Sequence, residues 1–189
     1  MREATARPLD LDVLGWIKAR EKKILLVTAA VQLLILVAMI AVRAMPLMTG
    51  QTVLVRVVPV DPRDLFRGDY VRLSYDFSRI PPEGIEGVAG GQYGEAWRKN
   101  GRTIYAPLLP DADRVHWRAE KITVTKPETG LFLKGQVGPY GTLEFGIESY
   151  YLQEGTGHTY ERAIRDRKLS AELAVSSTGQ AALRGLRIE

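Results

Sequence analysis

An uninterrupted apolar run near the N-terminus restricts the fold of this 189-residue chain more than any other feature. Residues 24–42 contain no charged residue, no Gly and no Pro, and their only polar side chains are Thr28 and Gln32. As an α-helix these 19 residues span about 28 Å, close to the ~30 Å hydrocarbon core of a bilayer. A soluble helix of this length normally carries a polar stripe. We therefore expect 24–42 to be a transmembrane helix.

The charges that flank this run predict its orientation. Six basic residues precede the run, whereas Arg43 alone follows it directly. Because basic flanks stay in the cytoplasm, we expect a cytoplasmic leader at 1–23, with a short interfacial helix, and export of the C-terminal part. A cleaved signal peptide is the competing interpretation. Both the leader and the run are long for a signal peptide, which favours an uncleaved anchor.

The charge total conceals this division of the chain. The formal net charge is +4, but residues 44–189 contain 19 basic and 18 acidic side chains. The exported part is therefore nearly neutral and lacks a basic stripe, so we expect no nucleic-acid partner. The chain has no Cys, which excludes disulfides, thiolate zinc sites, iron–sulfur clusters and a Cys nucleophile.

The residues after the run have the patterns of β-strands. A β-branched segment at 52–60 is followed by an alternating segment at 70–77, and further strand patterns occupy 103–109, 115–124, 131–137, 142–152, 169–175 and 181–188. The pairs 131–137 with 142–152 and 169–175 with 181–188 predict hairpins. A slip in apolar phase near Gly185 indicates a β-bulge.

These patterns predict a mainly β fold, in which one N-terminal transmembrane helix is followed by a small antiparallel β-sandwich or barrel-like domain. We expect a linker at 43–50 and an extracytoplasmic domain at 51–189. The Gly-rich segment 81–101 predicts a long loop within that domain, and 161–168 predicts a helical turn.

The most distinctive motif begins the second strand pattern. Gly68-Asp69-Tyr70, Leu73 and Tyr75 spell G-D-Y-x-x-L-x-Y. The chain resembles the bacterial membrane-protein family named after that pattern, the GDYXXLXY family. A second stretch, Gly146-Ile-Glu148 with Glu154-Gly155 and Glu161, is also similar to that family.

The resemblance covers roughly residues 22–189 and implies one anchor followed by a β-rich domain. It implies a bacterial cytoplasmic (inner) membrane location with a periplasmic or extracellular domain. Relatives are often encoded beside polytopic membrane proteins, which implies a polytopic membrane-protein partner in addition to the lipid bilayer. The resemblance assigns no catalytic residue.

The motif has a structural and a functional interpretation. Asp61-Pro62 and Gly68-Asp69 predict two turns that launch the strand, and the structural interpretation is a corner held by ion pairs. The functional interpretation is a recognition site for a ligand or partner. From the first stretch it contains Arg67, Asp69, Tyr70 and Arg72. From the second stretch it contains Glu148 and Glu154.

The carboxylates support a rival hypothesis of a membrane-tethered hydrolase that acts on an envelope polymer or peptide. Its acid–base groups are Glu148, Glu154 and Glu161, which must converge in one cleft beside Tyr70 or Asp69. Salt bridges to neighbouring arginines are the structural alternative. A third hypothesis is a glycan- or small-ligand-binding domain whose pocket is lined by Trp97, Trp117 and tyrosines.

Metal and cofactor chemistry has little support in the sequence. His116 and His158 lie 42 residues apart without a ligand spacing, and no phosphate-binding loop or dinucleotide fingerprint occurs. We therefore expect no metal and no cofactor. The leading expectation is a membrane-anchored extracytoplasmic module that acts as an interaction or accessory domain for a membrane or envelope partner.

Overall fold

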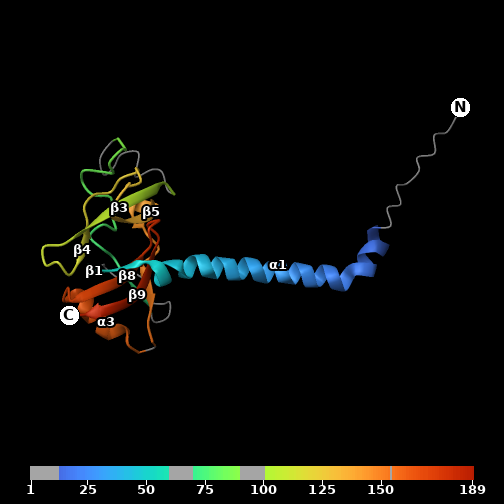
Figure 1. The fold of residues 1–189 in the computed structure, drawn as a ribbon. Coiled ribbons are helices and arrows are strands. Elements are labelled where there is room, and N and C mark those ends of the chain that lie inside the picture. Colours follow the sequence, from blue (N-terminus) through green and yellow to red (C-terminus); the bar gives the residue numbers. More distant parts are fainter. Residues whose placement is uncertain (1–12, 60–69, 90–100, 154) are drawn as a thin grey trace. The chain divides into compact units, whose positions relative to one another are not determined.

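The N-terminal apolar run forms a single long helix. The computed structural model describes residues 13–59, 70–89, 101–153 and 155–189, and the chain divides into two units at 1–42 and 43–189 (Figure 1). Helix α1 spans Val13–Thr49. Within the described residues it is the one helix long and apolar enough to cross a membrane. The apolar run is thus helical as expected, and the helix extends beyond both of its ends.

The C-terminal end of α1 is built into the second unit. Residues 43–49, expected as part of a linker, are helical, and Pro46 is buried. Gly50 ends the helix by donating from its N–H to the Pro46 carbonyl at 2.8 Å. A Cβ on Gly50 would approach that carbonyl and lie 2.9 Å from the Val175 nitrogen. The Arg184 guanidinium donates to the Leu47 carbonyl at 2.7 Å, which satisfies one of the open carbonyls of the last turn.

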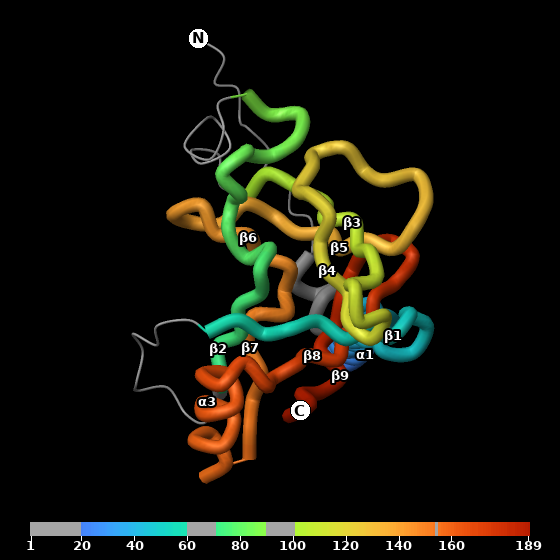
Figure 2. Tube along the Cα trace, turned by 90° about the vertical axis from the view of Figure 1, so that its left-hand side faces the viewer, coloured from blue at the N-terminus to red at the C-terminus, as the bar shows by residue number. Residues whose placement is uncertain are grey.

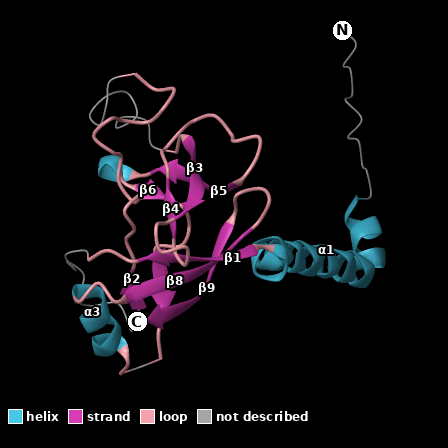
Figure 3. Ribbon diagram, turned by 60° about the vertical axis from the view of Figure 1, so that its left-hand side comes forward, coloured by secondary structure: helices cyan, strands magenta, loops and turns pink. Residues whose placement is uncertain are grey.

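The second unit consists of antiparallel sheets (Figure 3). One sheet has the order β1-β8-β9, with β1 at Gln51–Arg56, β8 at Leu169–Val175 and β9 at Ala181–Ile188. A four-stranded sheet has the order β4-β3-β5-β6, with β4 at Trp117–Ala119, β3 at Thr103–Pro110, β5 at Leu131–Val137 and β6 at Leu143–Glu144. The short strands β2 (Tyr70–Arg72) and β7 (Ser149–Tyr151) form a two-stranded ribbon. The predicted mainly β fold after one apolar helix is confirmed.

Alternation places one face of each sheet in a common core. Val71, Leu73, Tyr75 and Phe77 are all buried while Arg72 is exposed, as the pattern at 70–77 predicted. They join buried residues of the other sheets, among them Ile104, Leu133, Ile147, Ala171 and Leu173. The rings of Tyr75 and Phe77 stack with centroids 5.2 Å apart, and Phe77 meets Phe145 edge-on at 5.3 Å.

Several predicted elements are shorter or differently bounded. The segment 142–152 divides into β6 and β7, because Gly146 has a φ of +78° and turns the chain between them. A short 3₁₀ turn, η2 (Pro139–Gly141), connects β5 to β6. The strand pattern at 115–124 is reduced to β4. Helix α3 spans Gly157–Arg165, so it begins before the predicted turn, and it lies beside β2 and β8 (Figure 2).

The bulge predicted near Gly185 is present. Glu172 pairs with Gly185, but the next residue, Leu173, pairs with Leu183. Arg184 is therefore the extra residue of β9, and this insertion restores the inward phase of the apolar side chains after it. Of the predicted loop 81–101, residues 81–89 contain turns and one β-bridge, from Glu86 to Thr123, and 90–100 lie outside the described residues.

The turn between β8 and β9 allows a test of this packing. Gly179 has a φ of +84°, and a Cβ there would clash with the Phe132 ring. Gly101 has a φ of +79° with no atom within 4 Å of such a Cβ, so it is a matched control for backbone strain alone. We expect Gly101→Ala to lower the free energy of unfolding by about 1 kcal/mol and Gly179→Ala by about 2–4 kcal/mol. Denaturant unfolding of the full chain in detergent measures both; equal losses would contradict the clash.

Candidate functional site

The two motif stretches lie side by side in the β2–β7 ribbon. Tyr70 is paired with Tyr151, and Arg72 is paired with Ser149. Just beyond the ribbon, the Leu73 N–H donates to the Glu148 carbonyl at 2.8 Å. Of the G-D-Y-x-x-L-x-Y segment, residues 70–73 are therefore adjacent in the fold to the segment that follows Gly146.

The inward side of this ribbon is structural. Leu73, Tyr75 and Ile147 are buried, and the Tyr75 hydroxyl donates to the Ile147 carbonyl at 2.9 Å. Burial, and then the nearby negative charge of Glu148, raise the pKa of Tyr75 far above its usual value. Tyr75 thus stays a neutral hydrogen-bond donor, and it ties the first motif to the second.

Glu148 supports the turn that precedes β7. Its carboxylate is half-buried and accepts hydrogen bonds from the backbone N–H groups of Phe145 and Gly146. These amides belong to the left-handed turn at Gly146, so the side chain stabilises the change of direction between β6 and β7. Both carboxylate oxygens are engaged by the backbone.

The outward side of the ribbon contains Arg72 of the predicted recognition site, together with two residues that were not predicted. Arg72, Ser149 and Tyr151 are exposed, and Tyr151 retains 83% of its accessible surface. Strand pairing places Arg72 and Ser149 directly opposite each other. We call the surface formed by Arg72, Ser149 and Tyr151 the ribbon face.

The remaining predicted site residues are placed as follows. Arg67, Asp69 and Glu154 lie outside the described residues, as does Trp97. Glu161 is exposed on α3, where its carboxylate is 3.7 Å from Nδ1 of the exposed His158. Glu148 and Glu161 therefore have separate partners on different elements. Trp117 is partly buried against the core.

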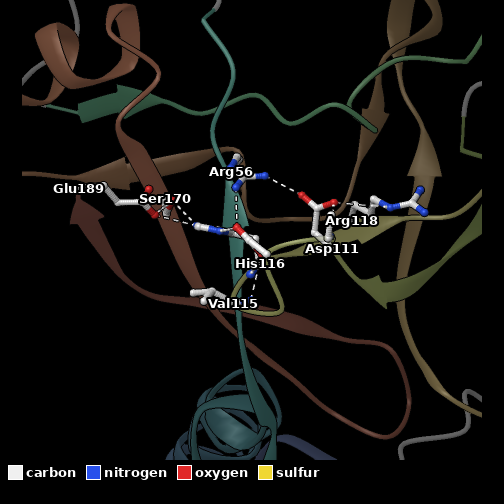
Figure 4. A network of polar contacts seen from close by, with 9 residues as sticks. Arg56, Asp111, Val115, His116, Arg118, Ser170 and Glu189 are labelled. Atoms are coloured by element: carbon white, nitrogen blue, oxygen red, sulfur yellow. Dashed lines mark hydrogen bonds and ion pairs between the residues drawn. The ribbon is translucent and has the colours of Figure 1, made fainter.

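A second polar site, which the sequence analysis did not single out, centres on His116 (Figure 4). This side chain is 4% exposed and belongs to the loop between β3 and β4. Its Nδ1 atom lies 2.6 Å from an Asp113 oxygen, whereas its Nε2 atom lies 3.0 Å from the Ser170 Oγ and 2.7 Å from a Glu189 oxygen. The Ser170 hydroxyl also donates to Glu189 at 2.9 Å.

The loop that presents His116 is closed by its own aspartates. Asp113 accepts hydrogen bonds from the N–H groups of Val115 and His116, both at 2.9 Å. Arg114 adopts a left-handed φ of +57° within this turn. From β1, Arg56 reaches Asp111 at 2.6 Å and Asp113 at 2.5 Å. The two aspartates followed by His116 in a tight hairpin loop were the available sequence signal, because Asp side chains bind nearby backbone amides in turns.

Hydrogen bonding determines the charge state of these carboxylates. The backbone N–H of His116, then its imidazole and the Val115 N–H, hold the pKa of Asp113 well below its usual range. The Ala112 N–H and then Arg56 lower the pKa of Asp111. The Ser170 hydroxyl and then His116 lower the pKa of Glu189. All three carboxylates are therefore anionic at neutral pH.

The order Ser170–His116–Asp113 matches the hydrogen bonds of a hydrolase triad, but its setting differs. Ser170 is 1% exposed near the start of β8, which is paired on both sides by β1 and β9. The Glu189 carboxylate lies against both the Ser170 hydroxyl and Nε2 of His116. A nucleophile must reach a substrate carbonyl, so this geometry serves to hold segments together. We call Arg56, Asp111, Asp113, His116, Ser170 and Glu189 the His116 clamp.

Other surface features add no chemical site within the described residues. A shallow depression is lined by Phe132 and Ser177 together with 126–130, and Trp117 is not among its lining residues. No group of three or more metal-ligating side chains occurs in the described part of the chain.

Comparison with known proteins identifies the family of this chain, and the matching region contains both motif stretches. A sequence profile of the family described as GDYXXLXY protein matches residues 32–186. The chain belongs to this family. No curated protein and no solved structure matches it. The GDYXXLXY match contains the whole ribbon and most of the His116 clamp, and it ends before Glu189.

The ribbon predicts the effect of changing Glu148. We expect Glu148→Ala to lower the free energy of unfolding by about 1–3 kcal/mol, because two turn amides lose their acceptor. Glu148→Gln keeps one acceptor oxygen and should lose less. Thermal unfolding of the full chain in detergent measures the difference, and an unchanged midpoint in Glu148→Ala would contradict the turn-supporting role.

The lowered pKa of Asp113 predicts an acid dependence. The stability that Asp113 contributes is fully present above its ordinary value of 3.8 and is lost as the pH falls from there toward its lower folded value. Asp113→Asn keeps an acceptor oxygen for the loop amides but cannot titrate. We expect its stability to decline less than that of the wild type between pH 5 and pH 2, as followed by unfolding midpoints; parallel declines would contradict this assignment.

Proposed function

We propose that this GDYXXLXY-family chain is a single-pass protein of a bacterial inner membrane, with a cytoplasmic N-terminus and an exported β domain. In this proposal the domain is an interaction or accessory module for a polytopic membrane or envelope partner. The apolar helix and its basic N-terminal flank support the location. The family resemblance supports the class of partner.

The observation that supports the proposal is that the two motif stretches contain both buried core residues and exposed residues. Their inward residues, Leu73, Tyr75 and Ile147, build the core, and Glu148 braces the adjoining turn. The same short ribbon presents Arg72 and Tyr151 outward. Arginine and tyrosine are enriched at binding hot spots, because each combines a large contact area with polar recognition. A ribbon that displays both side chains on one face is suited to protein recognition.

The junction with the helix supports a partner near the membrane. Residues 43–49 are helical, the Leu47 carbonyl accepts a hydrogen bond from Arg184 of β9, and Gly50 lies close to Val175 of β8. The chain therefore enters the domain without an extended linker. A domain attached in this way has a short reach, which favours partners embedded in the same bilayer.

Photo-crosslinking tests this proposal. A photoreactive phenylalanine analogue replaces Tyr151 in the full chain, and the control position is Tyr140, which is 87% exposed on the turn between β5 and β6. In native membranes we expect a discrete adduct with one membrane protein from position 151 and not from 140. Charge reversal by Arg72→Glu should reduce the adduct several-fold, because the guanidinium lies on the same face.

Other outcomes separate the hypotheses. Identical adducts from positions 151 and 140, or no adduct from either, would contradict the ribbon face as the interaction surface. An adduct with a second copy of the chain would indicate self-association instead of an accessory role. Loss of an envelope-degrading activity in both Glu148→Gln and Glu161→Gln, with unfolding unchanged, would favour the hydrolase hypothesis.

A further inference from the structure

We propose that the His116 clamp is a proton-dependent latch, which joins the loop at 111–116 to the end of β9 only while His116 is protonated. The proposal does not depend on the proposed function. It rests on the two carboxylates that His116 faces, one at each ring nitrogen.

The number of N–H hydrogens on the His116 imidazole determines how many of its two carboxylate contacts are hydrogen bonds. Nδ1 faces Asp113 at 2.6 Å, and Nε2 faces Glu189 at 2.7 Å. Ionised carboxylates only accept hydrogen bonds, and an imidazole donates from both nitrogens only in its charged form. Both contacts are therefore hydrogen bonds in the imidazolium alone. The Ser170 hydroxyl completes the arrangement by donating to Glu189 at 2.9 Å.

Loss of the proton opens one particular contact. Asp113 is fixed by Arg56 and by two amides of its own loop, so it retains the Nδ1 hydrogen of the neutral ring. Nε2 then presents a lone pair to the Glu189 carboxylate, and the two repel. The Ser170 hydroxyl, 3.0 Å away, turns to donate to Nε2. Glu189 then loses both donors, so the latch releases on the β9 side.

The surrounding charges make the proton necessary. Arg56 on β1 offsets Asp111 and Asp113 of the loop, and Arg118 on β4 lies 3.8 Å from Asp111. On the β8–β9 side, strand pairing places Arg187 beside Ser170, and Glu189 is the carboxylate that contacts the ring. His116 is 4% exposed, so water compensates little of the charge of this group. The imidazolium is the counter-charge that reaches Glu189 directly.

The latch connects two sheets. His116 extends from the β3–β4 loop of the four-stranded sheet, whereas Ser170 and Glu189 belong to the β8–β9 side of the other sheet. Its stabilisation requires the charged imidazole and is lost when the ring gives up its proton. We therefore expect the end of β9 to separate from the loop in mild alkali, while the loop keeps its ion pairs with Arg56.

Hydrogen exchange measured by mass spectrometry tests the latch on the full chain in detergent. Protection is compared at pH 5.5 and pH 8.5 after correction for intrinsic exchange rates. We expect peptides covering 183–189 to lose about tenfold in protection at pH 8.5, the equivalent of one net hydrogen bond, while 111–118, β3 and β5 keep theirs. Equal protection at both pH values would overturn the proposal.

Three variants make the test specific. Glu189→Gln has an amide that accepts from the charged ring and donates to the neutral ring, so it should abolish the pH response while keeping the fold. His116→Asn removes the titrating group and should also abolish the response. His158→Asn is the matched control, because that side chain is 97% exposed, and it should respond as the wild type does.

A pH response retained in Glu189→Gln would overturn the proposal, as would one lost in His158→Asn. If His116→Asn fails to fold, the comparison of Glu189→Gln with the wild type still decides the question.

Discussion

The pairing of the two motif stretches is the contact on which the rest of the β-rich unit depends. It brings residues 70–73 against 148–151 by backbone hydrogen bonds, and the Tyr75 hydroxyl reaches Ile147 beneath them. These segments are more than 70 residues apart, so their contact closes a large loop of chain. The four-stranded sheet lies within that loop, whereas β1 precedes the loop and β8 and β9 follow it. The motif therefore joins two segments that are distant in the sequence. Its inward residues pack in the core at this junction, and they are apolar or aromatic.

The sequence predicted those features that depend on the pattern of apolar residues. The apolar helix, the strands β3, β5, β8 and β9, and the bulge at Arg184 each follow from a period or from a slip in a period. The broken strand between β6 and β7 could not be predicted in this way. Its cause is the left-handed turn at Gly146 and the acceptor that Glu148 provides, and both are set by tertiary context.

The candidate site was predicted in part. Alternation was sufficient to place Arg72 on the exposed side of its strand, and the same rule buried Leu73 and Tyr75. The role of Glu148 was not predictable, because an acidic residue that binds turn amides has the same sequence appearance as one facing a cleft. The His116 clamp was missed for a similar reason. Its members come from four separate segments, and only the fold brings Asp113, Ser170 and Glu189 to one imidazole.

The bulge at Arg184 has a further effect on β9, which is an edge strand of its sheet within the described residues. Regular edge strands recruit other strands, and bulges and charged side chains prevent this by interrupting the row of backbone donors and acceptors. Arg184 supplies both the extra residue and the charge, and it bonds to the end of α1. The residue that bonds the last turn of α1 therefore also protects β9 against edge-to-edge pairing with other chains.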